Sequence, residues 1–537
     1  MNGAQLIIKL LEEHGVDVVF GYPGGTVLPL YKALYASKKI RHIRTSHEQG
    51  AAHAADGYAR VSGKTGVCIA TSGPGATNLV TGIANAYMDS VPTVFITANV
   101  PLSLIGTDSF QEVDITGITM SVTKHNFMIK NIEELAISVR SAFLIAESGR
   151  KGPVLIDVPK DILESEIPLE YSNLRPNLKN LNIKLPELNF DILPFAAELI
   201  NSSERPLILA GGGIQDSDAS DSVLLLAERI NAPICCSLMA IGEIPYSHRL
   251  YVGSPGEYGN KAANDALKDC DLIIAVGTRF SNRTAVEKFV KDASCKVIHI
   301  DTDRAEIKKI IQPDCYIVGD AQEAVSELAK IVSPREKWFS NCIKDEKTDD
   351  VLETIHDVFG DEAYIVTDVG LHQMWVAHGY PFQKKGHFIT SGGLGTMGFG
   401  LGAAIGIQVA HPDKPVILVT GDGSFLMNCN ELATVKGEKL PIIVVVVNNG
   451  KLGMVNSMMK NTRKGKFTAI KSSPRFSSLA RAFKIKGFKV NEPAGAFYIF
   501  PECDYYFGKK TPEGKVIEDA ADLAMYLLEV GHVAAVG

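Results

Sequence analysis

The sequence predicts an α/β protein with three doubly wound, parallel-sheet domains and a C-terminal fragment of a different character. Apolar, strand-like runs alternate with helical stretches through most of the 537 residues. Most of these runs lead into a turn that contains Gly, Pro, Asp or Asn, as in KPVILVTGDGS at 414–424. At roughly 150 residues per domain, the length allows three or four domains. We therefore expect a large α/β enzyme and not a small binding module or a fibrous protein.

The composition is that of an ordinary globular protein. Hydrophobic residues make up 46% of the chain and charged residues 21%, which argues against wholesale disorder. The formal net charge of −7 gives no general attraction to nucleic acid or to an anionic membrane. The nine cysteines form no CxxC motif and mostly lie in apolar runs, which indicates buried, reduced thiols. The N-terminus lacks the pattern of a signal peptide, so we expect a cytoplasmic protein.

The first block of strands and helices spans residues 1–165. It should begin with an amphipathic helix that carries Leu6, Leu10 and Leu11 on one face and ends at Gly15. Its predicted strands lie in VDVVFGYPGG, KTGVCIATSGPGATN, VPTVFITANV and GPVLIDVPKD. Residues 166–190 have no clear period and contain several Pro and Asn, so they are predicted to form a linker.

Two further blocks repeat this pattern. The second spans 191–335, and SPREKWFSNCIKDEKTDD after it is predicted to be a polar helical connector. The third spans 350–491 and includes the weakly polar run 394–410, which is too short for a bilayer span and should form a buried helix. Residues 492–537 differ, because six of the eleven residues from Phe497 to Phe507 are aromatic, against 7% in the whole chain. They should form a separate segment.

The third block carries the most specific motif in the sequence. Gly421-Asp422-Gly423-Ser424 follows one apolar strand, and Asn449 ends the next, 27 residues after Asp422. Both polar residues should therefore lie at the carboxyl ends of parallel strands, where open α/β sheets bind ligands. Carboxylate and amide oxygens suit Mg²⁺, and the flanking glycines allow backbone N–H groups to approach a phosphate.

The GDGS…NN motif resembles the diphosphate–Mg²⁺ motif of thiamine-diphosphate (ThDP) enzymes. The chain also resembles the acetolactate synthase (acetohydroxyacid synthase) large subunit family over about residues 1–491. The stretches that carry this resemblance are FGYPGG at 20–25, HEQGAAHAADGYAR at 47–60, GVCIATSGPGATN at 66–78, GTDSFQEVD at 106–114, TKHN at 123–126, GPVLIDVPKD at 152–161, HQMW at 372–375, TSGGLGTMGFGLGAAIG at 390–406 and LGMV at 452–455.

The resemblance implies three domains of the ThDP-enzyme type. Residues 1–165 would bind the cofactor's pyrimidine, residues 191–335 would form a Rossmann-like domain that could take FAD, and residues 350–491 would bind the diphosphate and Mg²⁺. The third domain would be truncated, because residues 492–537 resemble part of the small domain of a class I PLP-dependent aminotransferase. That family's cofactor lysine is absent, so no transamination follows from the tail.

The resemblance also assigns roles to individual residues. Glu48 matches the family's activating glutamate, which shares a proton with the cofactor's aminopyrimidine. Met397 matches the bulky residue that bends the cofactor. The other residues implied for ThDP are Pro23, Gly24, Gly25, His372, Gln373, Gly395, Gly421, Gly423, Ser424 and Met454. The residues implied for Mg²⁺ are Asp422, Asn449 and the carbonyl of Lys451. Those implied for the reaction pocket are Phe110, Gln111, Lys160 and Arg283. Those implied for FAD are Gly211, Gly212, Arg279 and Asp301. His47, His53 and His125 are expected to be structural.

Three positions depart from the family pattern. Glu257 stands where Met is usual, Met458 where Trp is usual, and Asn99 where Gln is usual. The Trp and Arg283 are associated in the family with preference for 2-ketobutyrate as the acceptor, so the replaced Trp leaves the choice of acceptor open.

The resemblance implies a ThDP- and Mg²⁺-dependent condensation of pyruvate with a second 2-keto acid. The product would be 2-acetolactate or 2-aceto-2-hydroxybutyrate, with loss of CO₂, in the first step of branched-chain amino acid biosynthesis. The alternatives are another ThDP-dependent carboligase or decarboxylase, and a chain made inactive by its replaced C-terminus. A family-type site combines Glu48 of one subunit with Asp422 and Asn449 of another, which implies a homodimer or homotetramer, and a small regulatory subunit is possible by analogy.

Overall fold

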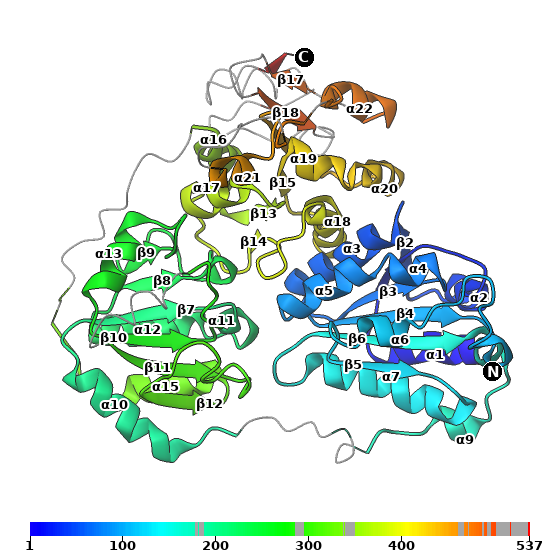
Figure 1. Cartoon of the computed structure of the whole chain (residues 1–537), viewed down its shortest axis with the longest axis horizontal. Helices are drawn as coiled ribbons and strands as arrows, with labels where there is room; N and C mark the ends of the chain where they lie inside the picture. The colour runs from blue at the N-terminus through cyan, green and yellow to red at the C-terminus, as the bar shows by residue number, and fades with distance from the viewer. Residues whose placement is uncertain are drawn as a thin grey trace. The chain divides into compact units, whose positions relative to one another are not determined.

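The computed structural model of the chain describes residues 1–177, 181, 187–284, 295–336, 338, 350–459, 467–470, 472–485, 488–490, 496–500, 516 and 535–536. The chain forms two compact units. The first comprises Met1–Ile183, Ala363–Gln373 and Ile389–Gly537, and the second comprises Lys184–Glu362 and Met374–Phe388. Each of the three predicted blocks contributes its own sheet (Figure 1).

The sheet of the first block has six parallel strands in the order β2-β1-β3-β4-β6-β5. The strands are β1 (Val18–Gly21), β2 (Arg41–Arg44), β3 (Gly66–Ala70), β4 (Thr93–Asn99), β5 (His125–Met128) and β6 (Pro153–Pro159). The central strands β3, β4 and β6 are buried along their whole length, as expected for a parallel sheet covered on both faces.

Helices cover both faces of this sheet (Figure 1). They are α1 (Gly3–Glu13), α2 (Leu28–Ala36), α3 (Glu48–Ser62), α4 (Pro74–Thr77), α5 (Val80–Met88), α6 (Ile115–Thr119), α7 (Ile132–Glu147), α8 (Lys160–Glu164) and α9 (Leu169–Ser172). The first helix confirms the prediction: it buries Leu6, Leu10 and Leu11, and Gly15 follows it with a φ of 75°. The predicted linker contains the short helix α9.

The sheet of the second block also has six parallel strands, in the order β12-β11-β10-β7-β8-β9. The strands are β7 (Pro206–Ala210), β8 (Ile234–Cys236), β9 (Tyr251–Gly253), β10 (Leu272–Val276), β11 (Lys296–Asp301) and β12 (Cys315–Val318). The helices described with it are α10 (Leu193–Ser202), α11 (Gly213–Asp216), α12 (Ser220–Ile230), α13 (Lys261–Asp269) and α15 (Ala321–Ile331). Buried Glu243 binds residues 374–388 to this unit, because its carboxylate accepts hydrogen bonds from Gly386 N (3.0 Å) and Ser220 Oγ (2.8 Å).

The sheet of the third block is mixed and has the order β14-β13-β15-β16-β18-β17-β19. Its strands are β13 (Tyr364–Thr367), β14 (Phe388–Ile389), β15 (Val416–Gly421), β16 (Ile443–Asn448), β17 (Phe488–Val490), β18 (Ala496–Phe500) and β19 (Ala535–Val536). The helices are α16 (Asp350–Phe359), α17 (Leu371–Gly379), α18 (Phe399–Ala410), α19 (Asp422–Leu426), α20 (Leu432–Gly437), α21 (Gly453–Met458) and α22 (Phe476–Ala482).

Contrary to the prediction of a separate segment, the described tail residues 496–500 form a strand of this sheet. Strand β18 pairs antiparallel with β16, from Val444 opposite Phe500 to Asn448 opposite Ala496. Strand β17 pairs antiparallel with both β18 and β19. Without β18, strand β16 would be an edge strand with unpaired backbone N–H and C=O groups. Pairing with β18 supplies hydrogen-bond partners for these groups. Strands β13, β15 and β16 of this sheet are parallel to one another, as predicted.

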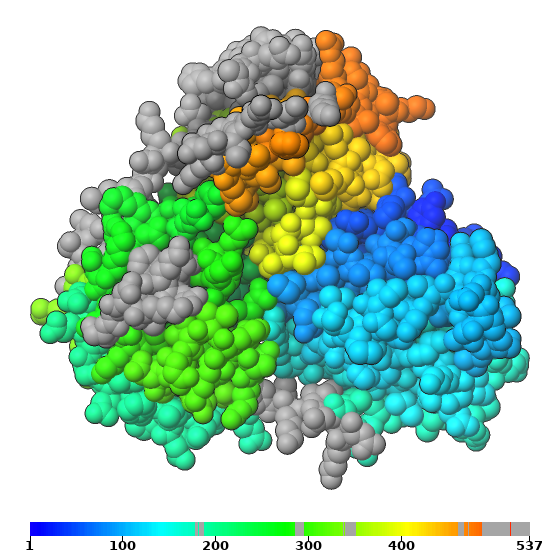
Figure 2. Space-filling model, in the orientation of Figure 1, coloured from blue at the N-terminus to red at the C-terminus, as the bar shows by residue number. Residues whose placement is uncertain are grey.

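Within the first unit, one hydrophobic core joins the first and third blocks. It contains Phe20 and Phe95 from the first block together with Phe399, Leu418 and Val446 from the third. Helices α3 and α18 pack against each other at its centre (Figure 1), and Figure 2 shows the surfaces of the two blocks in contact. A Cβ at Gly57 would collide with the carbonyl oxygen of Ala403, and one at Gly406 with that of Ala54, so both glycines permit close helix approach.

Other predictions are confirmed in part. The buried helix expected over 394–410 begins at Phe399, because Gly398 has a φ of 93° and Gly395 a φ of 73°. Residues 333–336 of the predicted polar connector are not helical, and most of the rest lies outside the described residues. Cys68, Cys236 and Cys315 are buried thiols on strands. In the described part of the chain, no helix has the length and apolar character to cross a bilayer.

Candidate active site

Strands β15 and β16 bring Asp422 and Asn449 to the same edge of the third sheet, as predicted. Asp422 is buried, and its Oδ2 accepts a hydrogen bond from Gly450 N at 3.0 Å. Burial raises the pKa of Asp422, although backbone N–H groups partly oppose the shift. Asn449 is exposed, and its Oδ1 accepts a hydrogen bond from Lys451 N at 3.1 Å. The backbone from 449 to 451 thus folds around the Asp422 carboxylate.

These oxygens are the donor types that Mg²⁺ prefers. No group of three or more His, Cys, Asp or Glu side chains suited to a metal occurs among the described residues. A metal at this edge would therefore need the Asn449 amide oxygen, a backbone carbonyl and oxygens of a ligand beside Asp422. The residues present fit a Mg²⁺ shared with a diphosphate.

His372 lies beside the same turn, near the start of α17. A Cβ on Gly421 would lie 3.0 Å from His372 Nδ1, so this glycine permits the imidazole to approach. Burial lowers the pKa of His372 to about 4, which keeps the ring neutral at pH 7. Its Nε2 is buried and has no hydrogen-bond partner within the described part of the chain. A buried polar atom without a partner is costly, so a ligand atom here would stabilise the site.

Segment 390–398 connects β14 to α18. It contains Met397, and it accepts hydrogen bonds from Gln373. Gln373 Nε2 donates to Thr390 Oγ1 at 2.7 Å and to Ser391 O at 3.2 Å. Met397 Cε lies 3.7 Å from the position of a Cβ on Gly423, so the structure brings the predicted wedge residue next to the GDG turn. Gly395, with its left-handed backbone, lies in the same segment.

The last two residues predicted for ThDP in this block are Ser424 and Met454. Ser424 Oγ donates to Val369 O at 2.8 Å, so its hydroxyl connects the turn to the loop after β13. Met454 lies in α21, immediately after Gly453.

Asp368, which was not among the predicted site residues, anchors segment 390–398 from the end of β13. Its carboxylate accepts hydrogen bonds from Gly398 N (2.8 Å) and Gly400 N (3.3 Å). Complete burial raises the pKa of Asp368 to about 6, against the effect of these hydrogen bonds. An acidic residue after an apolar strand, as in YIVTDVG, was the available signal.

Glu48 is the first residue of α3, and the structure places it against the GPGATN turn. Asn78 Nδ2 donates to Glu48 Oε2 at 2.9 Å, and a Cβ on Gly75 would lie 3.4 Å from Oε1. The glutamate is half-buried. His47 caps the helix by accepting from Gln49 N at 3.1 Å, which confirms a structural role.

A second carboxylate, Glu431, contacts the start of α3 and was also missed. It belongs to the third block, is fully buried and accepts hydrogen bonds from Ser46 N (3.0 Å) and Thr434 Oγ1 (2.6 Å). Burial raises its pKa, and the charge of Glu48 adds to the shift. The carboxylate lies where a side chain at position 50 would be, which explains Gly50. No local motif predicts this contact, because it depends on the packing of two blocks.

The other predicted residues of the first block are only partly brought together. A Cβ on Gly73 would lie 2.9 Å from Gln111, so Gln111 packs against the same GPGATN turn that Glu48 contacts. Phe110 is 88% exposed. Lys160 Nζ lies 3.9 Å from Glu164 Oε1 on its own helix. Gly24 packs against Thr71, whereas a Cβ on Gly25 would meet open space, and Pro23 precedes them in the same turn.

The two remaining histidines are structural as expected. His53 is fully buried with its ring 5.3 Å from that of Phe399, and burial lowers its pKa to about 3. His125 packs its ring 4.4 Å from that of Phe127.

In the second unit, packing within the domain accounts for the glycines expected to bind FAD. A Cβ on Gly211 would collide with the backbone of Gly277, and Gly213 N donates to Gly277 O at 3.0 Å. A Cβ on Gly212 would lie 3.1 Å from that of Met239. Asp301 Oδ1 accepts from Asp303 N at 2.8 Å. These close contacts are made by the chain itself, so they give no independent indication of a flavin.

The two arginines and Glu257 lie in neighbouring loops of this unit. Arg279 is partly buried just after β10, whereas Arg283 and Glu257 are exposed. The backbone of Arg283 contacts Gly256, whose φ is 125°. The two stretches PGEYG and TRFSNR therefore lie side by side.

Comparison with known families matches all three blocks to thiamine pyrophosphate (ThDP) enzymes. Residues 1–118 match the N-terminal TPP binding domain, residues 193–328 the central domain, and residues 368–498 the C-terminal TPP binding domain. The last match extends into β18.

Several curated proteins are similar over most of their length. The probable acetolactate synthase large subunit of Methanocaldococcus jannaschii is 44% identical over 524 residues, covering 92% of this chain and 88% of the relative. The acetolactate synthase large subunit of Corynebacterium glutamicum is 42% identical, covering 88% and 78%. The acetolactate synthase isozyme 1 large subunit of Escherichia coli K12 is 42% identical, covering 85% and 83%.

Proposed function

Because the chain belongs to the family of acetolactate synthase large subunits, we propose that it condenses pyruvate with a second 2-keto acid and releases CO₂. The product is 2-acetolactate when the acceptor is pyruvate and 2-aceto-2-hydroxybutyrate when it is 2-ketobutyrate. This condensation is the first step of branched-chain amino acid biosynthesis. The observation that carries the proposal is the 44% identity to a relative over 92% of the chain.

The cofactor is ThDP, since both terminal blocks match TPP binding domains. When bound, ThDP supplies the nucleophilic carbon that adds to the keto group of pyruvate. Asp422, Asn449 and the carbonyl of Lys451 would hold Mg²⁺ between the protein and the diphosphate. His372, with its unpartnered Nε2, and Gln373 would orient the diphosphate side, and Met397 would support the ring beside Gly423.

Glu48 would hold and move the proton at the aminopyrimidine nitrogen. Asn78 donates to one of its oxygens at 2.9 Å, and the other oxygen lies near Gly75, 3.4 Å from the position of a Cβ there. Gln111 packs against the same turn, which supports a place for it, with Phe110, in the reaction pocket. Lys160 and Arg283 are proposed on the family resemblance alone.

The partners are also proposed from the family. The relatives are named as large subunits, which supports a small regulatory subunit as a partner. A homodimer in which Glu48 of one chain serves the diphosphate site of another would explain why Phe110 is 88% exposed in the single chain. FAD binding in the second block stays a prediction, which the visible absorption spectrum of the purified protein tests.

The function is tested by incubating the chain with pyruvate, ThDP and Mg²⁺. We expect acetolactate, detected as acetoin after acid treatment. Cofactor binding without this product would contradict the proposal. Met458, 52% exposed at the end of α21 where the family usually has Trp, makes the acceptor worth testing separately. A mixture of pyruvate and 2-ketobutyrate should give acetolactate as the main product, and no preference for pyruvate as donor would favour another ThDP-dependent carboligase or decarboxylase.

A further inference from the structure

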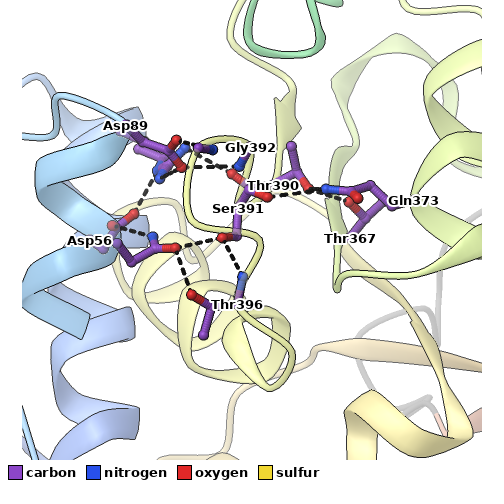
Figure 3. Close-up of polar contacts among 11 residues, drawn as sticks. Asp56, Asp89, Thr367, Gln373, Thr390, Ser391, Gly392 and Thr396 are labelled. Carbon is purple, nitrogen blue, oxygen red and sulfur yellow. Dashed lines mark hydrogen bonds and ion pairs between the residues drawn. The ribbon is translucent and has the colours of Figure 1, made fainter. Parts of the chain in front are cut away.

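A buried polar network connects helices α3 and α5 of the first block to segment 390–398 of the third (Figure 3). At its centre, Arg60 donates from Nε to Asp56 Oδ1 and from Nη2 to Asp89 Oδ2, at 2.5 and 2.9 Å. The two carboxylates are fully buried and the Arg60 side chain is 9% exposed. Burial alone would lower the pKa of Arg60, but the charges of Asp56 and Asp89 outweigh it and raise the pKa.

The network contacts the backbone of the segment at three positions, Thr390, Gly392 and Gly393. Arg60 Nη1 donates to Thr390 O at 3.0 Å. Asp89 accepts from Gly392 N at 3.2 Å and from Gly393 N at 2.6 Å. A Cβ on Gly393 would lie 2.8 Å from Asp89 Oδ1, so a glycine is needed for this approach.

A second branch of the network fixes the fold of the segment itself. Asn85 Nδ2 donates to Asp56 Oδ2 at 3.0 Å, which turns Asn85 Oδ1 towards the segment. There Oδ1 accepts from Ser391 Oγ at 2.5 Å and from Thr396 Oγ1 at 3.2 Å. Ser391 Oγ in turn accepts from Thr396 N at 2.8 Å, which closes the loop between residues 391 and 396.

The residues fixed in this way adjoin those that face the cofactor. Gly395 and Met397 flank Thr396, and Gln373 donates to Thr390 and Ser391 on the opposite side (Figure 3). We propose that Asn85 and Asp89 are positioning residues of the cofactor site. They act through Ser391 and the Gly392–Gly393 backbone and hold Gly395 and Met397 in the conformation that binds ThDP. This inference rests on the proposed function.

The expected consequence is a change in the affinity for ThDP. When only a fraction of the molecules have the segment in its binding conformation, the apparent dissociation constant rises by the inverse of that fraction. Removing one buried hydroxyl that fixes the segment should lower the equilibrium constant for the binding conformation about tenfold, and the fraction falls by the same factor when that conformation is not strongly favoured over the others. The effect should fall on ThDP affinity, whereas the affinity for pyruvate at saturating ThDP should change little.

The test measures the ThDP dissociation constant in the presence of Mg²⁺, from the ThDP-dependent rise of the melting midpoint. Asp89→Asn is the most direct variant but leaves Arg60 with Asp56 as its one charged partner in the network, so this variant can fail to fold. Ser391→Ala is milder, because it removes only the hydroxyl between Asn85 and Thr396 N. We expect Ser391→Ala to bind ThDP about tenfold more weakly, with the pyruvate KM at saturating ThDP within about twofold of wild type.

Two control variants separate positioning from general stability. Ser220→Ala removes an equally buried hydroxyl hydrogen bond in the other unit, from Ser220 Oγ to Glu243. Glu438→Gln weakens another contact between the first and third blocks, the 2.7 Å ion pair with Arg41. Both should keep wild-type ThDP affinity even if the melting midpoint of the apo protein falls.

The outcomes distinguish the two levels of the proposal. Weaker ThDP binding by Ser391→Ala alone would support the positioning role. Wild-type affinity in Ser391→Ala, with a loss of thermal stability like that of Ser220→Ala, would overturn the inference and leave the proposed function intact. A wild-type chain whose melting midpoint does not respond to ThDP and Mg²⁺ would overturn both.

Discussion

Segments 390–398 and 104–113 both carry predicted site residues, but the protein holds them in different ways. Segment 390–398 is tied to a different block by buried charges, since Asp89 accepts from the backbone of two of its glycines. Segment 104–113 is closed on itself: Glu112 accepts from Ser109 N (2.8 Å) and Ser109 Oγ (3.1 Å), and Phe110 is 88% exposed.

The difference indicates that the two sides of the site have different requirements. The proposed cofactor side is held by the chain itself, so its geometry depends on packing between blocks. The proposed reaction-pocket side has internal hydrogen bonds but leaves Phe110 exposed, and we propose that a second subunit covers it. Substitutions in the two segments should therefore separate effects on folding from effects on catalysis.

The largest expected effect on stability is that of Asp89→Asn. Loss of this buried charge leaves Arg60 with Asp56 as its charged partner and weakens the bonds to Gly392 and Gly393, which should cost about 3–5 kcal/mol. The measurement is the melting midpoint of the apo protein. The paired change Glu112→Gln, in the open segment, should leave the midpoint unchanged. Equal losses in both variants would contradict the distinction between the two segments.

A smaller effect is expected from Asp368, the second anchor of segment 390–398. Its folded-state pKa of about 6 lies above the value of about 4 for an unfolded Asp. A raised carboxyl pKa contributes stability that is complete below about pH 4 and is lost as the pH rises through about 6. Asp368→Asn does not titrate, so wild type should lose about 2 kcal/mol relative to this variant between pH 4 and pH 7.

This pH dependence is measured as the difference in melting midpoint between the two proteins across that range, which cancels the titration of groups they share. A difference that stays constant with pH would show that Asp368 has the same pKa in the folded and unfolded states, so that its burial does not raise its pKa.

The sequence predicted those features that depend on local pattern. Apolar runs that end in polar turns predicted the parallel strands, and the separation of Asp422 and Asn449 predicted their convergence, because the carboxyl ends of neighbouring parallel strands meet. The features it missed depend on which helix packs against which loop. Asn85 and Glu431 lie on or beside helices, and no local signal relates them to residues about 300 to 390 positions away in the chain.

Glycine patterns were ambiguous for a related reason. Gly211 and Gly423 both predicted close approach to a ligand, but the group near Gly211 is the backbone of Gly277. A glycine indicates that something comes close without indicating what it is. The tail is a further example. Its aromatic composition predicted a separate segment, but it did not predict that β18 pairs with β16.

The smallest expected effect on stability is that of Phe110→Ala. The side chain is 88% exposed, so the free energy of unfolding of the single chain should change by less than about 0.5 kcal/mol. If Phe110 lines the reaction pocket, kcat/KM for pyruvate should nevertheless fall about tenfold. The two values come from thermal melts and initial rates on the same preparation. An unchanged kcat/KM would remove Phe110 from the pocket.

The most direct test of the central claim, that this chain performs ThDP chemistry through Glu48, is the rate of acetolactate formation by Glu48→Gln at saturating ThDP and Mg²⁺, with bound ThDP measured in the same sample. Gln keeps the size of the side chain and its hydrogen bond with Asn78, but it cannot take or give the proton. We expect the rate to fall about 100-fold or more with ThDP occupancy unchanged. A variant that retains the wild-type rate would contradict the claim.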